Sequence, residues 1–295
     1  MSVLYIDGYE VSITNPEKLL WPELGIRKID YITRIIELAP YIIPHAYNRL
    51  LTTIRYPHGY IGKSFYQKNT PKHAPEWIKT HPWHDNNYIL LNDSATLVWL
   101  ANQAALELHT AFNYYTNELR PKDIIFDLDP AEGLRFSDTA EVALNINEEL
   151  KKLNVNSYVK MSGATGLQIY IPVNEKYDYD TARKINHIFA IFFVNKYPNK
   201  ITIERVVKKR GQRVYFDYLQ MWSGKTIISP YSPRATAQAT VAVPVEWQEL
   251  EKGAKPEDYT LLNISARLKK KGDLFLPLLE EGQKQNLDFI LERLT

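Results

Sequence analysis

The sequence of 295 residues contains no cysteine. A disulfide framework, a thiol nucleophile, a zinc–thiolate site and an iron–sulfur cluster are therefore excluded. Any metal ion must be held by oxygen atoms or by imidazole nitrogens. The sequence also lacks a dominant charge, since 36 Lys and Arg residues against 34 Asp and Glu residues give a formal net charge of +2. This balance excludes a histone-like protein that coats nucleic acid indiscriminately.

Long apolar runs are missing as well. The longest, around residues 188–194, is much shorter than the roughly 20 residues that span a bilayer. No basic segment leads into an apolar one at the N-terminus, so we expect no secretory signal. The composition, 45% hydrophobic and 24% charged residues, is that of an ordinary folded protein. We therefore expect a cytoplasmic protein without membrane contact, with one large domain or two of average size.

Hydrophobic periodicity in the first half predicts strands mixed with two helices. Alternation around Asp7-Gly8 predicts a β-hairpin over residues 3–13, because a type I′ turn needs positive φ at two positions. Helical spacing predicts one helix from residue 29 that ends at Pro40, and a second from Asp93 or Ser94 that ends at His109. Between them we expect strands 50–55 and 61–66 around a turn at residues 57–59, then a loop over residues 70–87.

The second half predicts the order β-α-β-β-α-β. Its strands are 124–130, two that flank residues 162–166, one near 201–204 and one over 214–219. Its helices begin near Asp138, where Asp138 and Glu141 resemble a capping box, and near Ile185. This order resembles a split βαβ, or RRM-like, sheet with helices on one side. The expected fold class is α/β of the α+β type, with a mixed or antiparallel sheet.

Two carboxylates stand out on the strand 124–130. Asp127 and Asp129 point to the face opposite Phe126 and Leu128, about 7 Å apart along the strand at a rise of about 3.3 Å per residue. They could bind one hard cation or bracket two. The alternative is a solvated strand end followed by an Asp-Pro turn.

Asp217 adds a third carboxylate in an apolar strand, where a charge is costly without a cation or a hydrogen-bond partner. An ion pair with Arg213 or Lys225 would explain it. Three aspartates on two adjacent strands would instead form the carboxylate cradle of two-metal phosphoryl or nucleotidyl transfer.

Other segments carry weaker signals. The loop Ser162-Gly163-Ala164-Thr165-Gly166 suits either backbone N–H groups that converge on an anion or a plain hairpin turn. Lys225 and Arg234 could neutralise a triphosphate or could be surface charges. His81 and His84 are three residues apart, but the proline between them argues against a helix that would align them as metal ligands.

These motifs resemble, in order, the polymerase domain of bacterial ligase D, a member of the archaeo-eukaryotic primase superfamily that works in non-homologous end joining. The resemblance covers about residues 10–250. The segments that carry it are Asn15-Pro16-Glu17-Lys18-Leu19-Leu20-Trp21-Pro22, Lys28, Phe65-Tyr66-Gln67-Lys68, Gln103-Ala104-Ala105-Leu106-Glu107-Leu108-His109, Phe126-Asp127-Leu128-Asp129-Pro130, Ser162-Gly163-x-x-Gly166-Leu167, Asp217-Tyr218-Leu219-Gln220 and Pro230-Tyr231-Ser232-x-Arg234.

The resemblance implies metal-dependent addition of nucleoside triphosphates to a primer 3′ end at gaps or breaks in DNA. Asp127, Asp129 and Asp217 would be the catalytic residues that hold two Mn²⁺ or Mg²⁺ ions. The remaining roles implied by the family fall into three groups: nucleotide binding by His109, Ser162, Gly163, Thr165, Gln168, Gln220, Lys225 and Arg234; binding of a downstream 5′-phosphate by Asn15, Lys18 and Lys28; and template contact by Arg55, Phe65 and Tyr66.

Two positions depart from the family's usual Ser-Gly-x-Lys-Gly-Leu-His loop. Thr165 replaces the lysine and Gln168 replaces the histidine. Strand alternation directs Gln168 away from Leu167 and toward the site, where it can donate a hydrogen bond but cannot become cationic. Nucleotide affinity should therefore fall unless Lys160 or Lys225 compensates.

These departures keep open a non-catalytic module of the same fold that binds DNA ends or 5′-phosphates. A metal-dependent phosphohydrolase that uses the same acids is a third alternative, although nothing in the sequence marks a water-activating base. The resemblance also implies a stand-alone domain over residues 1–295, with a DNA-end-binding module over about 1–120, a catalytic core over about 121–250 and a tail over about 251–295. A separate ATP-dependent DNA ligase and a Ku-type end-binding protein are the expected partners, and the protein would associate with the nucleoid when it acts.

Overall fold

The computed structural model describes residues 2–280 and 285–292. The chain divides into two compact units, and each is assembled from segments that lie far apart in the sequence. The first unit comprises Met1–Thr116, Thr226–Ala242 and Tyr259–Asp273, and the second comprises Asn117–Lys225, Val243–Asp258 and Leu274–Thr295. The division along the sequence at about residues 120 and 250 stays a prediction.

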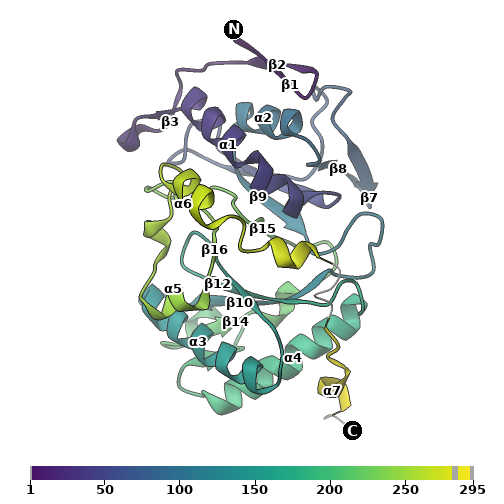
Figure 1. The fold of residues 1–295 in the computed structure, drawn as a ribbon, viewed down its shortest axis with the longest axis vertical. Coiled ribbons are helices and arrows are strands. Elements are labelled where there is room, and N and C mark those ends of the chain that lie inside the picture. Colours follow the sequence, from purple (N-terminus) through teal and green to yellow (C-terminus); the bar gives the residue numbers. More distant parts are fainter. Residues whose placement is uncertain (1, 281–284, 293–295) are drawn as a thin grey trace. The chain divides into compact units, whose positions relative to one another are not determined.

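The first unit is built on a sheet with the strand order β15-β9-β5-β8-β7, in which β6 also pairs with β5. Helices α1 and α2 contact each other in this unit (Figure 1). Its elements are β1 (Ser2–Ile6), β2 (Tyr9–Ile13), β3 (Leu19–Trp21), β4 (Ile26–Arg27), α1 (Lys28–Ala46), β5 (Leu50–Arg55), β6 (Phe65–Gln67), β7 (Thr80–Trp83), β8 (Asn86–Leu90), α2 (Ser94–Asn102), β9 (Ala105–Ala111), β15 (Thr226–Ile228) and α6 (Ile264–Lys271).

The second unit is built on a sheet with the strand order β13-β14-β10-β12-β11-β16. Strand β10 runs antiparallel to both of its neighbours, β12 and β14. Its elements are β10 (Asp123–Pro130), α3 (Phe136–Lys152), β11 (Tyr158–Met161), β12 (Leu167–Pro172), α4 (Tyr179–Lys196), β13 (Ile201–Thr202), β14 (Val214–Phe216), β16 (Pro244–Val245), α5 (Trp247–Glu251) and α7 (Asp288–Leu291). The expected α+β class and the β-α-β-β-α-β order are confirmed.

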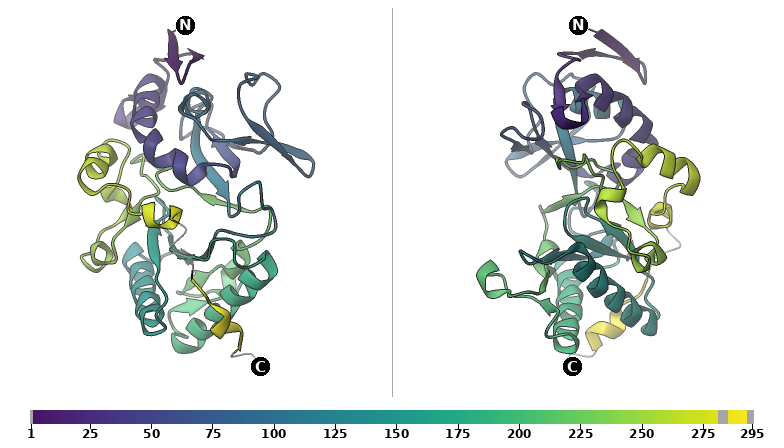
Figure 2. Two further views of the ribbon diagram at one scale, coloured as in Figure 1. Left: turned by 45° about the vertical axis from the view of Figure 1, so that its right-hand side comes forward. Right: turned by 90° about the vertical axis from the view of Figure 1, so that its left-hand side faces the viewer.

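Helices α3 and α4 both pack against β10 on the same side of the sheet (Figure 2). Aromatic rings form part of this contact. The ring centroid of Phe126 on β10 lies 5.2 Å from that of Phe189 on α4 and 4.9 Å from that of Phe216 on β14. The apolar residues of β10 therefore face the helices. Alternation along the strand directs Asp127 and Asp129 to the opposite face.

The N-terminal hairpin forms as predicted. Strands β1 and β2 pair antiparallel, with Ile6 opposite Tyr9. The two turn residues, Asp7 and Gly8, have φ angles of 52° and 82°, which is the pair of positive values that a type I′ turn requires.

The prediction that α1 ends at Pro40 is wrong, because the helix continues through Pro40 and Pro44 to Ala46. Both prolines are exposed, so backbone carbonyls deprived of an N–H partner can bind water instead. The buried face of the helix, which includes Leu38 and Ile42, runs on past Pro40. Burial of this face outweighs the local cost of proline.

The second helix is shorter than predicted. Asp93 caps α2 as expected, accepting a hydrogen bond from Thr96 N at 2.7 Å. The helix ends at Asn102, not at His109, because Ala104 adopts a positive φ of 56° and the chain continues as strand β9. Leu108 thus fits the helical spacing by coincidence and belongs to a strand.

Four other boundaries differ from the sequence prediction. The expected loop 70–87 contains β7 and the start of β8, which pair in a hairpin. The strand predicted over 61–66 is only β6, and β14 ends at Phe216 before a 3-10 helix over Tyr218–Gln220. Helix α3 starts at Phe136, so Asp138 is its third residue and accepts the Arg135 N–H at 2.8 Å. No described helix has the length and hydrophobicity needed to cross a membrane.

A capping carboxylate gives a test of the second unit's stability. Asp178 accepts a hydrogen bond from Thr181 N at 2.7 Å at the start of α4. Backbone and side-chain hydrogen bonds from Thr181 hold the pKa of Asp178 below its usual range. Asp178→Ala should lower the free energy of unfolding by about 1 kcal/mol at pH 7.

This difference should shrink as the pH falls through the lowered pKa, because a protonated carboxyl no longer accepts the bond as an anion. Denaturant unfolding at pH 7 and pH 3 measures it. Asp180→Ala is the control, since the Asp180 side chain is 88% exposed in its ion pair with Arg183 and the capping residue of α4 is Asp178. An equal loss in both variants would contradict the assignment.

Candidate active site

The structure places two of the three predicted aspartates on β10 and the third directly after the neighbouring strand β14, in the second unit. Asp127 on β10 lies opposite Gln168 on β12, and Asp129 lies opposite Tyr215 on β14. Asp217 follows β14, and its N–H donates to the carbonyl oxygen of Asp127 at 2.9 Å. The sheet register therefore fixes the backbone of all three acids.

The three carboxylates repel one another. Burial, followed by the charge of Asp129 and then that of Asp217, raises the pKa of Asp127 to about 8. A hydrogen bond from Gln168 Nε2 to Asp127 Oδ1 at 3.1 Å and the charge of Lys160 act in the opposite direction. They do not compensate fully, so the site favours a proton or another cation.

The Asp217 carboxylate is held by its own strand and the turn after it. Its Oδ1 accepts hydrogen bonds from the Tyr215 hydroxyl at 3.2 Å and from Leu219 N at 3.1 Å. Burial and this carboxylate raise the pKa of Tyr215 to about 12. The alternative ion pair is not formed among the described residues, since Lys225 Nζ donates to the carbonyl of Leu219 at 2.9 Å and Arg213 Nε to that of Arg210.

The donor set suits a hard divalent cation. Carboxylate oxygens are the ligands that Mg²⁺ and Mn²⁺ prefer. The Gln168 side chain, whose Nε2 donates to Asp127, also carries a buried Oε1 that has no hydrogen-bond partner. Within residues 2–280 and 285–292, however, no three His, Asp or Glu side chains already stand in a metal-binding cluster. The backbone pairing thus brings the three acids near one another, but their side chains are not arranged as a complete set of metal ligands in the described part of the chain.

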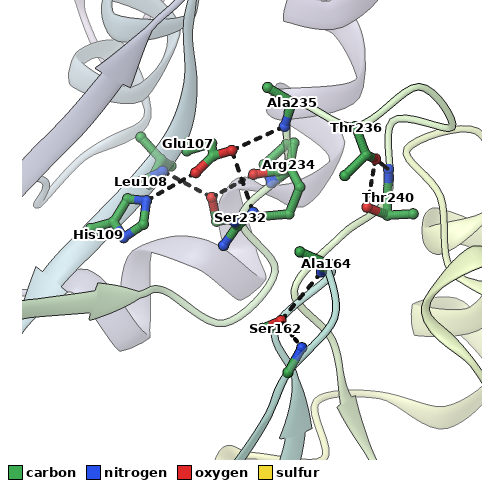
Figure 3. Close-up of polar contacts among 12 residues, drawn as sticks. Glu107, Leu108, His109, Ser162, Ala164, Ser232, Arg234, Ala235, Thr236 and Thr240 are labelled. Carbon is green, nitrogen blue, oxygen red and sulfur yellow. Dashed lines mark hydrogen bonds and ion pairs between the residues drawn. The ribbon is translucent and has the colours of Figure 1, made fainter. Parts of the chain in front are cut away.

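The loop between β11 and β12 is a tight hairpin turn. Ser162 Oγ accepts the N–H groups of Ala164 at 3.3 Å and Gly166 at 3.1 Å (Figure 3). Ser162 N in turn donates to the carbonyl of Gly166 at 3.0 Å. Gly163 has a φ of 75°, while Thr165 is exposed. Because two of its N–H groups point inward, the loop offers the Ser162 hydroxyl hydrogen and fewer amides to an anion than the sequence suggested.

Gly166 has a role that sequence reasoning missed. A Cβ atom there would come within 2.8 Å of the Leu128 carbonyl oxygen and 3.0 Å of Asp129 Oδ1. Only glycine therefore lets the loop lie against the second aspartate. The second glycine of the Ser-Gly-x-x-Gly motif was the available signal.

A second polar cluster lies in the first unit, where β9 and the loop after β15 meet. Glu107 Oε2 lies 3.1 Å from His109 Nε2, while Oε1 accepts the Ala235 N–H at 3.1 Å and lies 3.4 Å from Arg234 Nε (Figure 3). The hydroxyl of Ser232 accepts the N–H of Leu108 at 2.9 Å. The structure thus joins the predicted residues His109 and Arg234 through Glu107, to which the sequence reasoning assigned no role.

Burial of Glu107 would by itself raise its pKa. The hydrogen bond from His109, the charges of Arg234 and His109 and the Ala235 N–H outweigh burial and hold the pKa below its usual range. Glu107 is therefore ionised at neutral pH. An ionised carboxylate only accepts hydrogen bonds, so the proton of this contact sits on His109 Nε2.

The predicted template residues also meet in the first unit. The Arg55 guanidinium carbon lies 5.2 Å from the ring centroid of Phe65. Its nitrogens donate to the Gln103 carbonyl at 2.8 Å, to Gln103 Oε1 at 3.0 Å and to Gln67 Oε1 at 3.1 Å. All three acceptors are neutral, so the charge of Arg55 is not cancelled by them. Tyr66 is 72% exposed on the same strand as Phe65.

The residues predicted to bind a 5′-phosphate form a cationic cluster. Lys28 is buried, and its Nζ donates to the carbonyl of Thr14 at 2.7 Å. Burial and the charges of Lys18 and Arg55 lower the pKa of Lys28. Lys28 N donates to the Lys18 carbonyl, and Lys18 N to the Asn15 carbonyl. The local fold thus concentrates positive charge that an anion would relieve.

Two further candidates, Gln220 and Lys225, lie in the segment after Asp217. Gln220 ends the 3-10 helix over Tyr218–Gln220, and its N–H donates to the carbonyl of Asp217 at 3.2 Å. Their proposed contacts with a nucleotide stay a prediction.

Comparison with known proteins identifies the family. Residues 27–275 match the model of the LigD primase-polymerase domain. The chain belongs to this family. The resemblance drawn from the sequence motifs is thereby confirmed.

Members of the LigD family from several bacteria are similar to this chain. The bifunctional non-homologous end joining protein LigD of Bacillus subtilis is 36% identical over 286 residues, which is 97% of this chain and 47% of that protein. The multifunctional protein LigD of Mycolicibacterium smegmatis is 31% identical over 282 residues, 92% of this chain and 37% of that protein. The chain therefore spans less than half the length of these LigD proteins.

A solved structure supports the fold of this LigD family member. The polymerase domain of Mycobacterium tuberculosis ligase D, in complex with DNA, matches with a TM-score of 0.84 and 27% identity. The match covers 92% of this chain and 98% of that domain.

The repulsion at Asp127 gives a pH-dependent test. A carboxyl with a raised pKa binds its proton more tightly in the folded than in the unfolded protein, so it stabilises the fold at low pH. That stability is lost as the pH rises from about 4, the ordinary carboxyl range, to about 8. In EDTA, Asp127→Asn should therefore melt at least about 2 °C above wild type at pH 9 and nearly with it at pH 4.

Thermal unfolding across this pH range measures the difference. The control is Asp85→Asn, at an exposed position of the first unit. If the gap between Asp127→Asn and wild type is the same at pH 4 and pH 9, burial and the neighbouring carboxylates do not raise the pKa of Asp127 as described.

Proposed function

We propose that the protein is a primase-polymerase of DNA repair by non-homologous end joining. It adds nucleoside triphosphates, ribo or deoxy, to a primer 3′ end at gaps or breaks in DNA. The observation that carries this proposal is the group of three aspartates, in which burial and the charges of Asp129 and Asp217 raise the pKa of Asp127. Membership of the LigD primase-polymerase family supports it.

Asp127, Asp129 and Asp217 are the proposed ligands of two Mn²⁺ or Mg²⁺ ions. When bound, such ions lower the pKa of the primer 3′-hydroxyl and stabilise the pyrophosphate leaving group. The protein's own contribution is to hold the carboxylates by register and to limit their motion. Gln168 orients Asp127, while Tyr215 and Leu219 orient Asp217.

Nucleotide binding is proposed for two groups of residues, each described within its own unit. In the second unit these are Ser162, Gly163, Thr165, Gln168, Gln220 and Lys225; in the first they are His109 and Arg234. The fully buried Lys160 adds a cation whose charge reaches Asp127. We infer that Lys160 compensates in part for the absence of a lysine at 165 and a histidine at 168.

DNA contacts are proposed for the cationic cluster of the first unit. Asn15, Lys18 and Lys28 would receive the 5′-phosphate on the far side of a gap, because the like charges around Lys28 favour an anion there. Arg55, Phe65 and Tyr66 would contact the template by stacking and by charge. The chain's relatives are named for non-homologous end joining. We therefore propose that the protein acts on broken DNA together with an ATP-dependent ligase and a Ku-type protein. Its proposed location is the cytoplasm, at the nucleoid.

Extension of a gapped duplex tests the catalytic proposal. A duplex with a 5′-phosphate at the gap, Mn²⁺ and nucleoside triphosphates should give primers longer by one or more nucleotides. Asp127→Ala and Asp217→Ala should each reduce the rate more than about 100-fold, because the remaining carboxylates cannot hold the metal. Gel-resolved primer extension measures the rates.

DNA binding serves as the control in the same experiment, since both alanine variants should bind the gapped duplex as wild type does. Binding without extension by the wild-type protein, with ribo- and deoxyribonucleotides and either metal, would sink the polymerase proposal and favour an end-binding module. Rapid hydrolysis of triphosphates without DNA would favour a phosphohydrolase.

A second experiment tests the 5′-phosphate site. Lys18→Ala should weaken binding to a gapped duplex that carries a 5′-phosphate by about tenfold, because a charge-assisted contact is lost. The same variant should bind a duplex with a 5′-hydroxyl as wild type does. Fluorescence anisotropy at fixed salt measures both.

Lys72→Ala is the matched control for charge, since Lys72 is an exposed lysine of the same unit. If Lys18→Ala and Lys72→Ala weaken both duplexes equally, Lys18 contributes only general attraction to DNA.

A further inference from the structure

One buried carboxylate holds two of the residues proposed to bind the nucleotide. The Glu107 side chain is only 5% exposed and uses both oxygens, Oε2 toward His109 Nε2 at 3.1 Å and Oε1 toward Ala235 N at 3.1 Å. Oε1 also lies 3.4 Å from Arg234 Nε. Figure 3 shows that these contacts connect β9 with the loop that carries Arg234.

The local fold explains why this carboxylate reaches both partners. Glu107 and His109 are two residues apart on β9, so their side chains lie on the same face of the strand. Ile228 at the end of β15 pairs with His109, and Ser229 N donates to the carbonyl of Leu108. The loop that follows then turns back so that Ala235 N meets Glu107.

A buried carboxylate next to an anion-binding site needs a reason. Its negative charge opposes a bound triphosphate, and burial alone disfavours its ionised form. It is kept ionised by His109, Arg234 and the Ala235 N–H. Its contacts orient the two cations, because they fix the Nε2 edge of the His109 ring and the Nε side of the Arg234 guanidinium.

We propose that Glu107 is a positioning residue for nucleotide binding: it orients His109 and Arg234 toward the triphosphate without contacting the substrate itself. This inference rests on the nucleotide-binding role proposed above. The chemical class that the oriented pair would recognise is a polyphosphate, since the cluster keeps a net positive charge when both partners are protonated.

The direction in which Glu107→Gln changes ATP affinity distinguishes a positioning role from a purely electrostatic one. If Glu107 acted only as a negative charge, Glu107→Gln would strengthen ATP binding. If Glu107 positions the two cations, the same variant should weaken ATP binding by about tenfold, because the neutral amide cannot both accept from His109 Nε2 and form the ion pair with Arg234. Calorimetric titration of the full chain with ATP and Mg²⁺, without DNA, gives the affinity.

A mutant cycle that combines substitutions at Glu107, His109 and Arg234 completes the experiment. Glu107→Gln should have little further effect in an Arg234→Ala, His109→Ala background, because Glu107 acts through those residues. Glu149→Gln is the matched control: Glu149 is 8% exposed and pairs with Lys152 and Lys196, outside both polar clusters described above. It should leave ATP affinity unchanged.

A second measurement on the wild-type protein covers failure of the variant to fold. In ¹⁵N-histidine spectra, His109 Nε2 should carry its proton at pH 7.5, and ATP should shift the His109 resonances. Tighter ATP binding by Glu107→Gln, full additivity in the cycle, or His109 signals that ATP leaves unmoved would each overturn the proposal. Wild-type protein that binds ATP with the expected cycle but does not extend primers would instead overturn the polymerase function and leave the role of Glu107 standing.

Discussion

Burial of Asp127 beside two further carboxylates, those of Asp129 and Asp217, is the constraint on which the candidate active site depends. Strand β10 holds Asp127 and Asp129 on one face because Phe126 and Leu128 are buried on the other. Pairing with β14 brings Asp217 alongside, and its N–H is tied to the backbone of Asp127. The aromatic core packs against the other face of β10, and Gly166 leaves no room for a side chain beside Asp129. The fold therefore holds the carboxylates where they repel one another, and a bound divalent cation would offset this repulsion.

The first unit shows the complementary arrangement. Burial and the nearby charges of Lys18 and Arg55 lower the pKa of Lys28, and the oxygen atoms that accept hydrogen bonds from Arg55 and Lys28 in the described part of the chain are neutral. Around Glu107 the balance is different, because one carboxylate serves two cations. The near-zero net charge of the chain thus conceals an acidic cluster in one unit and cationic clusters in the other, as expected for a protein that binds metal ions and phosphates.

Much of the second unit could be predicted because apolar runs mark its strands and charged residues interrupt those runs. Asp217 in Val-Tyr-Phe-Asp and the pair Asp127 and Asp129 were found in this way, and Gln168 faces Asp127 as alternation requires. The first unit was harder. Residues 94–109 fit a helical period throughout, and only the positive φ of Ala104 reveals that β9 starts there. Pro40 was expected to end α1, but burial of the helix face decides the outcome. Glu107 could not be assigned a role, because its partners Arg234 and Ala235 are more than a hundred residues away in the sequence.

The central claim is that the repelling aspartates exist to hold divalent cations. Direct titration of the full chain with Mn²⁺ at pH 7.5, without DNA or nucleotide, tests it most directly. Wild-type protein should bind Mn²⁺, and Asp127→Asn and Asp217→Asn should each lose that binding while Glu149→Gln retains it. Mn²⁺ binding that is equally strong in all four proteins, or absent from the wild type, would contradict the account.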